Sequence, residues 1–210
     1  MSLIAEVKRA SPSAGPIAEV DSAGQAAAYA QGGAAAISVL TEPRHFGGSV
    51  ADLRSVRGRT SIPVLRKDFI VHPSQVIQSR AEGADAVLLI ATAVTESELE
   101  ELRCVAEEMG MSALVEAHTE ADLGRALASG ARMVGVNARD LETLEVDGDR
   151  AFELAAKVPP ELVLVIESGI RTREDVLRAG EAGAHAVLVG EALMRSADPS
   201  RAVATLLGRR

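Results

Sequence analysis

The chain alternates between amphipathic stretches and short apolar runs, with a glycine at the change from one to the other. Gly32, Gly83, Gly130 and Gly183 each follow an amphipathic stretch and precede an apolar run such as Ala-Val-Leu-Val. A helix that ends at a glycine and leads through a short turn into a strand produces this pattern. Because the runs are apolar almost throughout, we expect strands that are covered on both faces.

Counted along the chain, the pattern predicts eight strands and eight helices. The strands are expected over 3–8, 35–40, 62–67, 85–90, 112–116, 132–136, 162–167 and 185–189. The helices are expected over 19–31, 50–57, 72–82, 95–109, 119–129, 148–157, 172–182 and 198–208, with capping signals at Thr95 and Thr119. Eight strand-then-helix units favour parallel strands with right-handed crossovers, and eight strands close a barrel. The predicted fold class is therefore α/β, with 1–210 forming a single (β/α)8 TIM-barrel domain.

An open doubly wound sheet is the structural alternative. Such a sheet usually has fewer strands and carries a glycine-rich turn, G-x-G-x-x-G, after the first one. The first predicted strand is instead followed by Arg-Ala-Ser-Pro-Ser-Ala-Gly over 9–15. This departure favours the barrel.

Composition restricts the expected partners and compartment. Apolar residues make up 47% of the chain and aromatic residues only 2%, so we expect a globular domain with an aliphatic core. The net charge of −8 disfavours nucleic-acid binding, which needs a basic surface. Cys104 is the only cysteine, and the sequence has neither a signal-like N-terminus nor the ~18 consecutive apolar residues of a membrane span. We expect a cytoplasmic protein without a nucleic-acid or membrane partner.

Charged side chains gather at the carboxyl ends of the predicted strands, where barrels of this kind carry their active sites. Alternation along a strand puts Glu6 and Lys8 on one face. It also turns Lys67, Glu116 and Glu167 toward the side of their apolar neighbours, which fill the barrel. Because inward layers take side chains from alternate strands, we expect these groups to form one ring. The alternative is two structural ion pairs, Lys8 with Glu6 and Lys67 with Glu116.

Lysine is rare in this sequence. The 22 basic residues include only Lys8, Lys67 and Lys157, and the other 19 are arginines. Arginine keeps its proton near neutral pH, whereas lysine gives it up when it is buried or crowded by another cation. A general acid needs that property. Two lysines at strand ends therefore indicate acid catalysis.

The loops after the last two predicted strands are suited to bind a phosphate. They carry Ser168, Gly169 and Gly190, and glycine lets backbone N–H groups approach an anion closely. Ser11 after the first strand adds a hydroxyl donor. We expect Glu191 to contribute only its backbone N–H, with its carboxylate turned away.

Aromatic residues and histidines give weaker signals. Phe46 and Phe69 follow the second and third predicted strands, where we expect them either to line an apolar subsite for an aromatic ring or to plug the barrel mouth. The four histidines show no zinc-type spacing, so no metal site is expected. His118 is interpreted as a loop or cap residue.

Five segments together resemble the indole-3-glycerol phosphate synthase family. They are Ile-Ala-Glu-Val-Lys-Arg-Ala-Ser-Pro-Ser over 4–13, Lys-Asp-Phe-Ile over 67–70, Val-Glu-Ala over 115–117, Gly-Val-Asn-Ala-Arg-Asp-Leu over 135–141 and Glu-Ser-Gly-Ile over 167–170. The resemblance implies a lyase of tryptophan biosynthesis that uses no metal or organic cofactor. It implies closure of the pyrrole ring of 1-(2-carboxyphenylamino)-1-deoxyribulose 5-phosphate, with loss of carbon dioxide and water.

The resemblance also implies roles for individual residues. Lys67 is the implied general acid at the ribulose carbonyl, and Glu116 the acid or base of the dehydration. Lys8 is the group that holds the substrate carboxylate, and how the acid duty divides between Lys8 and Lys67 stays open. The further implied catalytic residues, which orient hydroxyls and the lysines, are Glu6, Asn137 and Glu167. The implied substrate contacts are Ser11, Ser168, Gly169 and Gly190 with Glu191 beside them for the phosphate, and Phe46, Phe69, Leu88 and Leu141 for the anthranilate ring, with Arg139 on its polar side.

The sequence departs from the family in one respect. Family members usually carry a helical extension before the first strand, whereas the first predicted strand here begins almost at Met1. We expect the lack of this segment to weaken substrate affinity and to expose apolar surface that favours self-association. The chain is therefore expected to be a monomer or a weak homodimer.

Two alternative functions stay open. One is a truncated, weakly active or inactive barrel that binds phosphate ligands. The other is a different ribulose-phosphate enzyme such as phosphoribosylanthranilate isomerase. That family carries a cysteine on the first strand and an aspartate on the sixth, where this chain has Glu6, Lys8 and Asn137.

Overall fold

Eight parallel strands close into a barrel at the centre of the computed structural model, which describes residues 1–12, 15–17, 20–139 and 148–209. Around the barrel the strands are β1 (Ser2–Val7), β4 (Ala36–Leu40), β5 (Val64–Lys67), β6 (Ala86–Ile90), β7 (Ser112–Ala117), β8 (Met133–Asn137), β9 (Val163–Glu167) and β10 (Ala186–Val189). The last strand pairs with the first, with Ser2 opposite Ala186. The predicted (β/α)8 barrel is confirmed.

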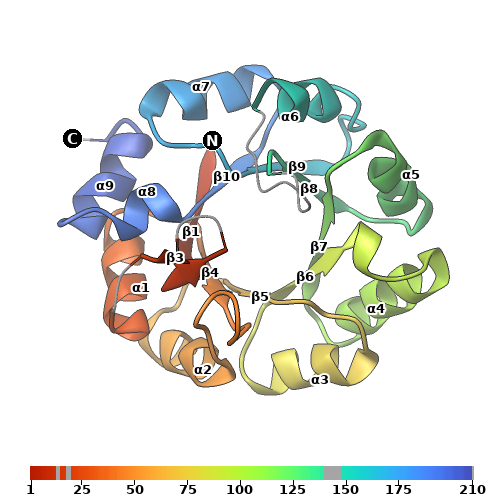
Figure 1. The fold of residues 1–210 in the computed structure, drawn as a ribbon, viewed down its shortest axis with the longest axis horizontal. Helices are drawn as coiled ribbons and strands as arrows, with labels where there is room; N and C mark the ends of the chain where they lie inside the picture. Colours follow the sequence, from red (N-terminus) through yellow and green to blue (C-terminus); the bar gives the residue numbers. More distant parts are fainter. Residues whose placement is uncertain (13–14, 18–19, 140–147, 210) are drawn as a thin grey trace.

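Helices surround the barrel as an outer ring (Figure 1). They are α1 (Ser22–Gln31), α2 (Val50–Arg59), α3 (Pro73–Ala81), α4 (Glu96–Glu108), α5 (Glu120–Ala128), α6 (Gly148–Ala155), α7 (Arg173–Glu181) and α9 (Pro199–Leu206). Three short additions follow strands: the antiparallel pair β2 (Ala10–Ser11) and β3 (Gly15–Pro16), the 3-10 turn η1 (Ala91–Ala93), and α8 (Glu191–Met194). The strand and helix pattern of the sequence predicted none of these three additions.

Capping residues fix where several helices begin. Thr95 and Thr119 each accept a hydrogen bond from the third residue of the helix that follows, as predicted, and Thr172 does the same for α7. His72 caps α3, whose first residue is a proline. These caps place helix starts at the end of the barrel where the strands finish.

Apolar residues pack in two layers, as alternation along the strands requires. One set packs between the strands and the helices and contains most of the buried apolar side chains, including Tyr29 of α1. The other fills the barrel axis and comprises Leu65, Leu88, Ile90, Leu114, Val165, Ala186 and Leu188. The inner set forms an apolar floor below the polar ends of the strands. No helix among the described residues is long and apolar enough to cross a membrane.

Candidate active site

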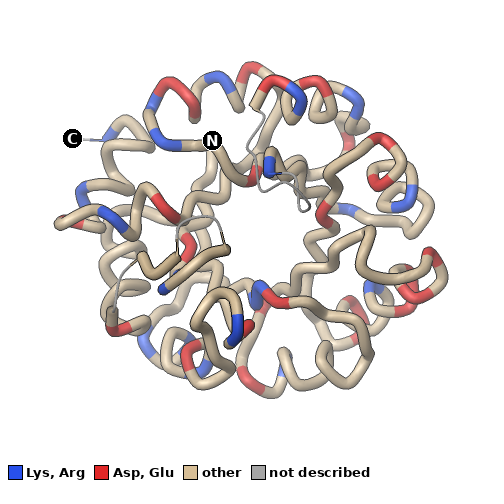
Figure 2. Tube along the Cα trace, viewed as in Figure 1, with Lys and Arg blue, Asp and Glu red and all other residues tan. Residues whose placement is uncertain are grey.

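A cavity of about 710 Å³ opens at the carboxyl ends of the strands. Its size is typical of sites for small organic ligands. The sequence-predicted site residues that line it are Glu6, Lys8, Ser11, Phe46, Lys67, Phe69, Leu88, Glu116, Asn137, Arg139, Glu167, Ser168, Gly169, Gly190 and Glu191. Leu141 lies outside the described residues. Figure 2 shows both signs of charge around the central opening and along the outer helices.

The lysines at the strand ends each contact carboxylates. Lys67 Nζ lies 3.5 Å from Glu116 Oε2 and 3.7 Å from Glu167 Oε2. Lys8 Nζ lies 2.9 Å from Glu6 Oε1. The sequence allowed either a ring of charged groups or two ion pairs. The structure has both, because the charged groups around the cavity are joined in ion pairs.

Burial and neighbouring charges give the three groups of this cluster different charge states. Burial would lower the pKa of Lys67, but the charges of Glu116 and Glu167 outweigh it and raise that pKa above its usual value. Burial would raise the pKa of Glu116, but Lys67 and His118 lower it to about 2. For Glu167, burial and the charge of Glu116 raise the pKa well above the usual value. Glu116 thus favours the ionised form and Glu167 the protonated form.

One expectation about Lys67 is wrong. The sequence suggested an ammonium crowded by another cation and ready to lose its proton. In the structure its nearest partners are the ionised carboxylate of Glu116 and the carboxyl group of Glu167, each only 1% exposed. Coulomb attraction in a water-poor site favours the charged lysine. Lys67 is therefore a firmly protonated donor.

Two glycines leave the space that the carboxylates occupy. A Cβ atom on Gly135 would overlap Glu167 Oε1 and lie 3.2 Å from its Cδ. A Cβ atom on Gly190 would overlap Glu6 Oε1 and lie 3.2 Å from Lys8 Nζ. Both glycines are thus needed for close approach between neighbouring strands. Gly190 was predicted only as an anion contact, and its packing against Glu6 and Lys8 is an additional role.

The loop after β9 has an unusual backbone. Ser168 has a φ of 65° and Gly169 a φ of 77°, so two consecutive residues lie in the left-handed region. This conformation is unfavourable for a residue with a side chain, and such strain concentrates at functional sites. Arg171, two residues further on, also lines the cavity, and the strand-end pattern did not single it out.

The loop after β10 lies across the same part of the cavity. Arg195 Nε donates to Glu191 Oε1 over 3.0 Å, so the carboxylate of Glu191 is engaged by a cation. Both side chains line the cavity together with the buried Ser11. Arg195 was not among the predicted site residues. Positive charge from arginine, backbone N–H groups and a hydroxyl thus meet at this end of the site.

The two phenylalanines form an aromatic pair at the cavity wall. Their ring centroids are 6.5 Å apart and their planes are inclined by 47°, a tilted arrangement that aromatic pairs favour. Phe69 is half-exposed, whereas Leu88 below is buried. An aromatic ligand between them would contact apolar surface on two sides.

A buried arginine next to Lys67 organises the end of β5. Arg66 points away from the barrel axis, toward α3, and is only 3% exposed. Its Nε donates to Thr41 Oγ1 over 3.0 Å, and its Nη2 donates to Asp68 Oδ2, also over 3.0 Å. Its Nη1 donates to Ser79 Oγ over 3.1 Å. Each nitrogen of this guanidinium thus donates a hydrogen bond to a neighbouring segment.

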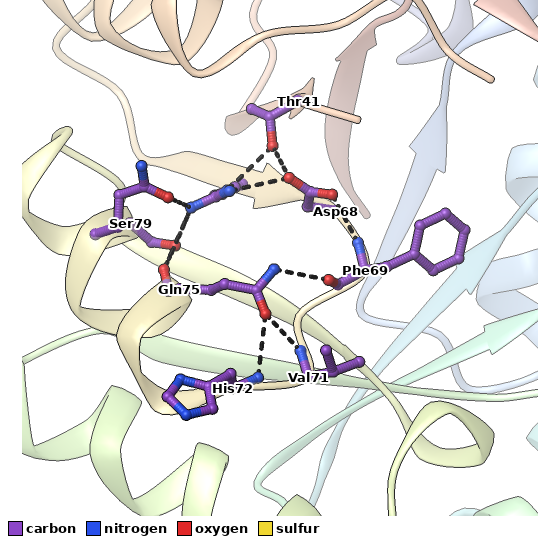
Figure 3. Close-up of polar contacts among 9 residues, drawn as sticks. Thr41, Asp68, Phe69, Val71, His72, Gln75 and Ser79 are labelled. Carbon is purple, nitrogen blue, oxygen red and sulfur yellow. Dashed lines mark hydrogen bonds and ion pairs between the residues drawn. The ribbon is translucent and has the colours of Figure 1, made fainter. Parts of the chain in front are cut away.

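The chain after Asp68 is fixed by side chains on both sides of Phe69 (Figure 3). Asp68 Oδ1 accepts the backbone N–H of Phe69 over 2.8 Å. Gln75 donates to the carbonyl of Phe69 over 2.9 Å and accepts the N–H groups of Val71 and His72. Lys67 and Phe69 are consequently placed in the cavity by a rigid loop.

His118 is a functional candidate that the sequence patterns missed. It lies in the loop between β7 and α5, as predicted. Its side chain also reaches the charged cluster, because Nε2 lies 2.9 Å from Glu116 Oε1. Nδ1 lies 2.9 Å from the carbonyl oxygen of Arg139. The alternation that places Glu6 and Lys8 on one face also applies to residues 116 and 118, and would have found it.

No group of three or more His, Cys, Asp or Glu side chains within the described ranges is arranged to hold a metal ion. The cavity instead combines one lysine between two carboxylates, an apolar wall and a polar end. Such a site can protonate an oxygen at one point and remove a proton at another.

Comparisons with known proteins agree with this chemistry. The family model described as indole-3-glycerol phosphate synthase matches residues 1–206. The indole-3-glycerol phosphate synthase of Rhodococcus jostii (strain RHA1) is 55% identical over 206 residues, covering 98% of this chain and 77% of that protein. That of Rhodococcus opacus (strain B4) is 54% identical with the same coverage. A solved 3-hexulose-6-phosphate synthase has a TM-score of 0.79 at 17% identity over 99% of both chains, which supports the fold alone.

Proposed function

This chain belongs to the indole-3-glycerol phosphate synthase family, and we propose that its ring closure takes place among Lys67, Glu116 and Glu167. The reaction joins an aromatic ring carbon of 1-(2-carboxyphenylamino)-1-deoxyribulose 5-phosphate to the ribulose carbonyl carbon. Carbon dioxide and water then leave. Each of these steps needs a charge or a proton at a defined atom, and the charged cluster supplies them.

Lys67 is proposed as the general acid of the ring closure. Attack by the aromatic carbon leaves negative charge on the ribulose carbonyl oxygen, and the ammonium of Lys67 protonates that oxygen. The raised pKa keeps the lysine protonated when substrate arrives, and the alkoxide formed by the attack is a strong enough base to take its proton. Solvent returns the proton to Lys67. Loss of carbon dioxide from the attacking ring carbon, which carries the carboxylate, leaves its bonding electrons to the ring and restores the aromatic ring.

Glu116 is proposed as the base of the dehydration. With a pKa of about 2 it is ionised at neutral pH and suited to take the proton that a ring carbon gives up. Lys67 protonates the departing hydroxyl group, which leaves as water. The two side chains are 3.5 Å apart, so Glu116 can then return the proton to Lys67 and both regain their starting states.

The remaining predicted residues are proposed to bind and orient the substrate. Lys8, held by Glu6, faces the carboxylate that is lost as carbon dioxide. Ser11, Gly169 and Gly190, with Ser168 and the backbone of Glu191 nearby, surround the phosphate. Phe46, Phe69 and Leu88 pack the aromatic ring, and Asn137, Arg139 and Glu167 orient the polar groups between them. Fixed binding of both substrate ends supplies the orientation that ring closure requires.

One observation carries the proposal: a partly buried, protonated lysine contacts the carboxyl groups of Glu116 and Glu167 above an apolar floor. The test is indole fluorescence after the purified chain is mixed with the carboxyphenylamino-ribulose phosphate. Lys67→Ala is expected to lower the rate by about 10³-fold or more, because it removes a charged donor and the acid together.

Lys157→Ala is the matched control for this substitution. Lys157 is half-exposed and pairs with Glu120 outside the cavity, so the rate is expected to stay unchanged. Thermal unfolding followed by circular dichroism verifies that both variants fold. Wild-type activity in Lys67→Ala would reject the assignment of the acid.

Two further properties belong to the proposal. We expect a cytoplasmic enzyme that is a monomer or a weak homodimer. Sedimentation velocity over a range of protein concentrations measures the second property. A stable tetramer would contradict it.

A further inference from the structure

The hydrogen bonds of His118 fix where its protons lie. A carbonyl oxygen can only accept, so Nδ1 must donate its proton to the carbonyl of Arg139 over 2.9 Å. The contact of 2.9 Å between Nε2 and Glu116 Oε1 then needs one further proton between these two atoms. Because Glu116 favours the ionised form, that proton belongs to Nε2. His118 is therefore an imidazolium that donates at both ring nitrogens.

Glu116 separates His118 from the substrate cavity. The side chain of His118 borders a different, small cavity of about 40 Å³, together with Thr119 and Asn137. Glu116 uses Oε1 for the histidine, while Oε2 is buried near Lys67 with no hydrogen bond within the described residues. Oε1 is thus fixed by the hydrogen bond from His118, and Oε2 can accept a proton from the substrate.

We propose that His118 is a positioning residue that holds Glu116 ionised and turns its Oε2 toward the substrate during dehydration. The proposal rests on the proposed role of Glu116 as the base. His118 itself gives up no proton in the step, because the proton of the ring carbon goes to Oε2. The carboxyl formed still accepts the Nε2 proton at Oε1, so the side chain keeps its orientation while the hydroxyl group leaves as water.

The charges around His118 support the imidazolium. Burial would lower the pKa of His118, but the hydrogen bond and the charge of Glu116 outweigh it and raise the pKa. From α5, Asp122 adds a negative charge and accepts the backbone N–H of His118 over 3.1 Å. Arg139 after β8 and Arg150 on α6 also border the small cavity, and the hydrogen bond to the carbonyl of Arg139 adds to the upward shift of the His118 pKa. The net direction is upward.

A pH dependence follows from this arrangement. Above the pKa of His118, Nε2 loses its proton and presents a lone pair to the Glu116 carboxylate. The hydrogen bond is then lost, and the carboxylate can turn away from the substrate. The wild-type kcat is expected to fall on the alkaline side as this happens, whereas KM stays nearly constant because His118 does not border the substrate cavity.

Two substitutions at His118 separate this role from a merely structural one. His118→Leu removes the donor and is expected to lower kcat at least tenfold with KM within a factor of two. His118→Gln can donate a hydrogen bond to Glu116 but does not titrate. It is expected to recover part of kcat and to lack the alkaline fall. His185→Gln, at an exposed histidine at the other end of the barrel, is the control and should match the wild type.

A titration of His118 by ¹⁵N nuclear magnetic resonance tests the proton positions independently of turnover. The pKa is expected above the ordinary value of about 6.5. In Glu116→Gln it should fall by about one unit or more, because the carboxylate charge is gone. A neutral ring in the wild type at pH 6, or an unchanged pKa in Glu116→Gln, would overturn the proposal.

The two experiments also distinguish the possible failures. Absence of any indole product from the wild type would defeat the proposed function and leave the titration result standing. An active wild type with full activity in His118→Leu would defeat only the role of His118. A variant whose thermal unfolding differs strongly from the wild type is replaced by His118→Asn, which retains a donor for the Arg139 carbonyl but is too short for Glu116. Equal kcat values for the Asn and Gln variants would also count against the proposal.

Discussion

The space beside Glu167 offers a sharp test of how the cluster is built. Replacing Gly135 by alanine adds one methyl group on β8, where the new Cβ would overlap Glu167 Oε1. The same atom would lie 3.2 Å from Glu167 Cδ and 3.3 Å from Leu114 Cδ1, whereas ordinary contacts begin at 3.4 Å. Both neighbours are buried, so the methyl group cannot be accommodated by a side chain moving into solvent.

The size of the effect follows from the displacement. To clear the methyl group, the carboxyl of Glu167 has to move by about 1 Å, and a displacement of that size near reacting groups costs about 10²-fold in rate. Overpacking of a core by one methylene costs about 1–3 kcal/mol of unfolding free energy. We therefore expect Gly135→Ala to lower kcat/KM by about 100-fold and to lower stability by about 2 kcal/mol.

Gly124→Ala is the control. Gly124 lies inside α5, and a Cβ there would meet no atom within 4 Å. Alanine is favoured over glycine in a helix by about 1 kcal/mol, so stability is expected to rise slightly and activity to stay the same. The assays are indole fluorescence for kcat/KM and urea unfolding for stability. Wild-type kcat/KM in Gly135→Ala would refute the claim that this glycine sets the position of Glu167.

Two further predictions concern stability. Burial would raise the pKa of Asp52, but its hydrogen bonds from Arg9 and two serines lower it to about 2. A lowered pKa stabilises the fold at pH above the unfolded value of 3.8, and the gain is lost as the pH falls toward 2. In urea unfolding, Asp52→Asn should therefore cost roughly 1 kcal/mol at pH 7 and almost nothing at pH 2, and a constant difference would contradict this. Asp68→Ala leaves the buried guanidinium of Arg66 without its carboxylate and should lower the free energy of unfolding by about 3 kcal/mol. Arg66→Met removes the buried charge itself and should lower it by less. The reverse order of the two variants would contradict the reasoning.

The strand ends were predictable because parallel strands in a barrel obey two simple periodicities. Alternation along each strand and the sharing of layers between alternate strands brought Lys67, Glu116 and Glu167 to one cavity without any knowledge of coordinates. The charge state of Lys67 was not predictable in this way. It depends on which side chain lies nearest at the 4 Å scale, and sequence spacing does not determine that.

The hydrogen bonds of Arg66 could not be predicted from the sequence, for a different reason. Its partners Thr41, Gln78 and Ser79 lie on other segments of the chain, and only the fold brings them to one point. An arginine that points outward from a strand usually suggests solvent, yet here α3 covers it. His118, by contrast, was within reach, because residues two apart on and just beyond a strand share a face.

Closure of the barrel has a consequence for how the protein is made. The strand Ser2–Val7 needs Ala36–Leu40 on one side and Ala186–Val189 on the other. The second partner is the last of the eight barrel strands to leave the ribosome. At ~5–20 residues per second, the first strand waits roughly 10–40 s with one bare edge. Nascent chains in this interval expose an unpaired strand edge to other chains, so we expect aggregation during synthesis to depend on this edge rather than on the stability of the finished fold.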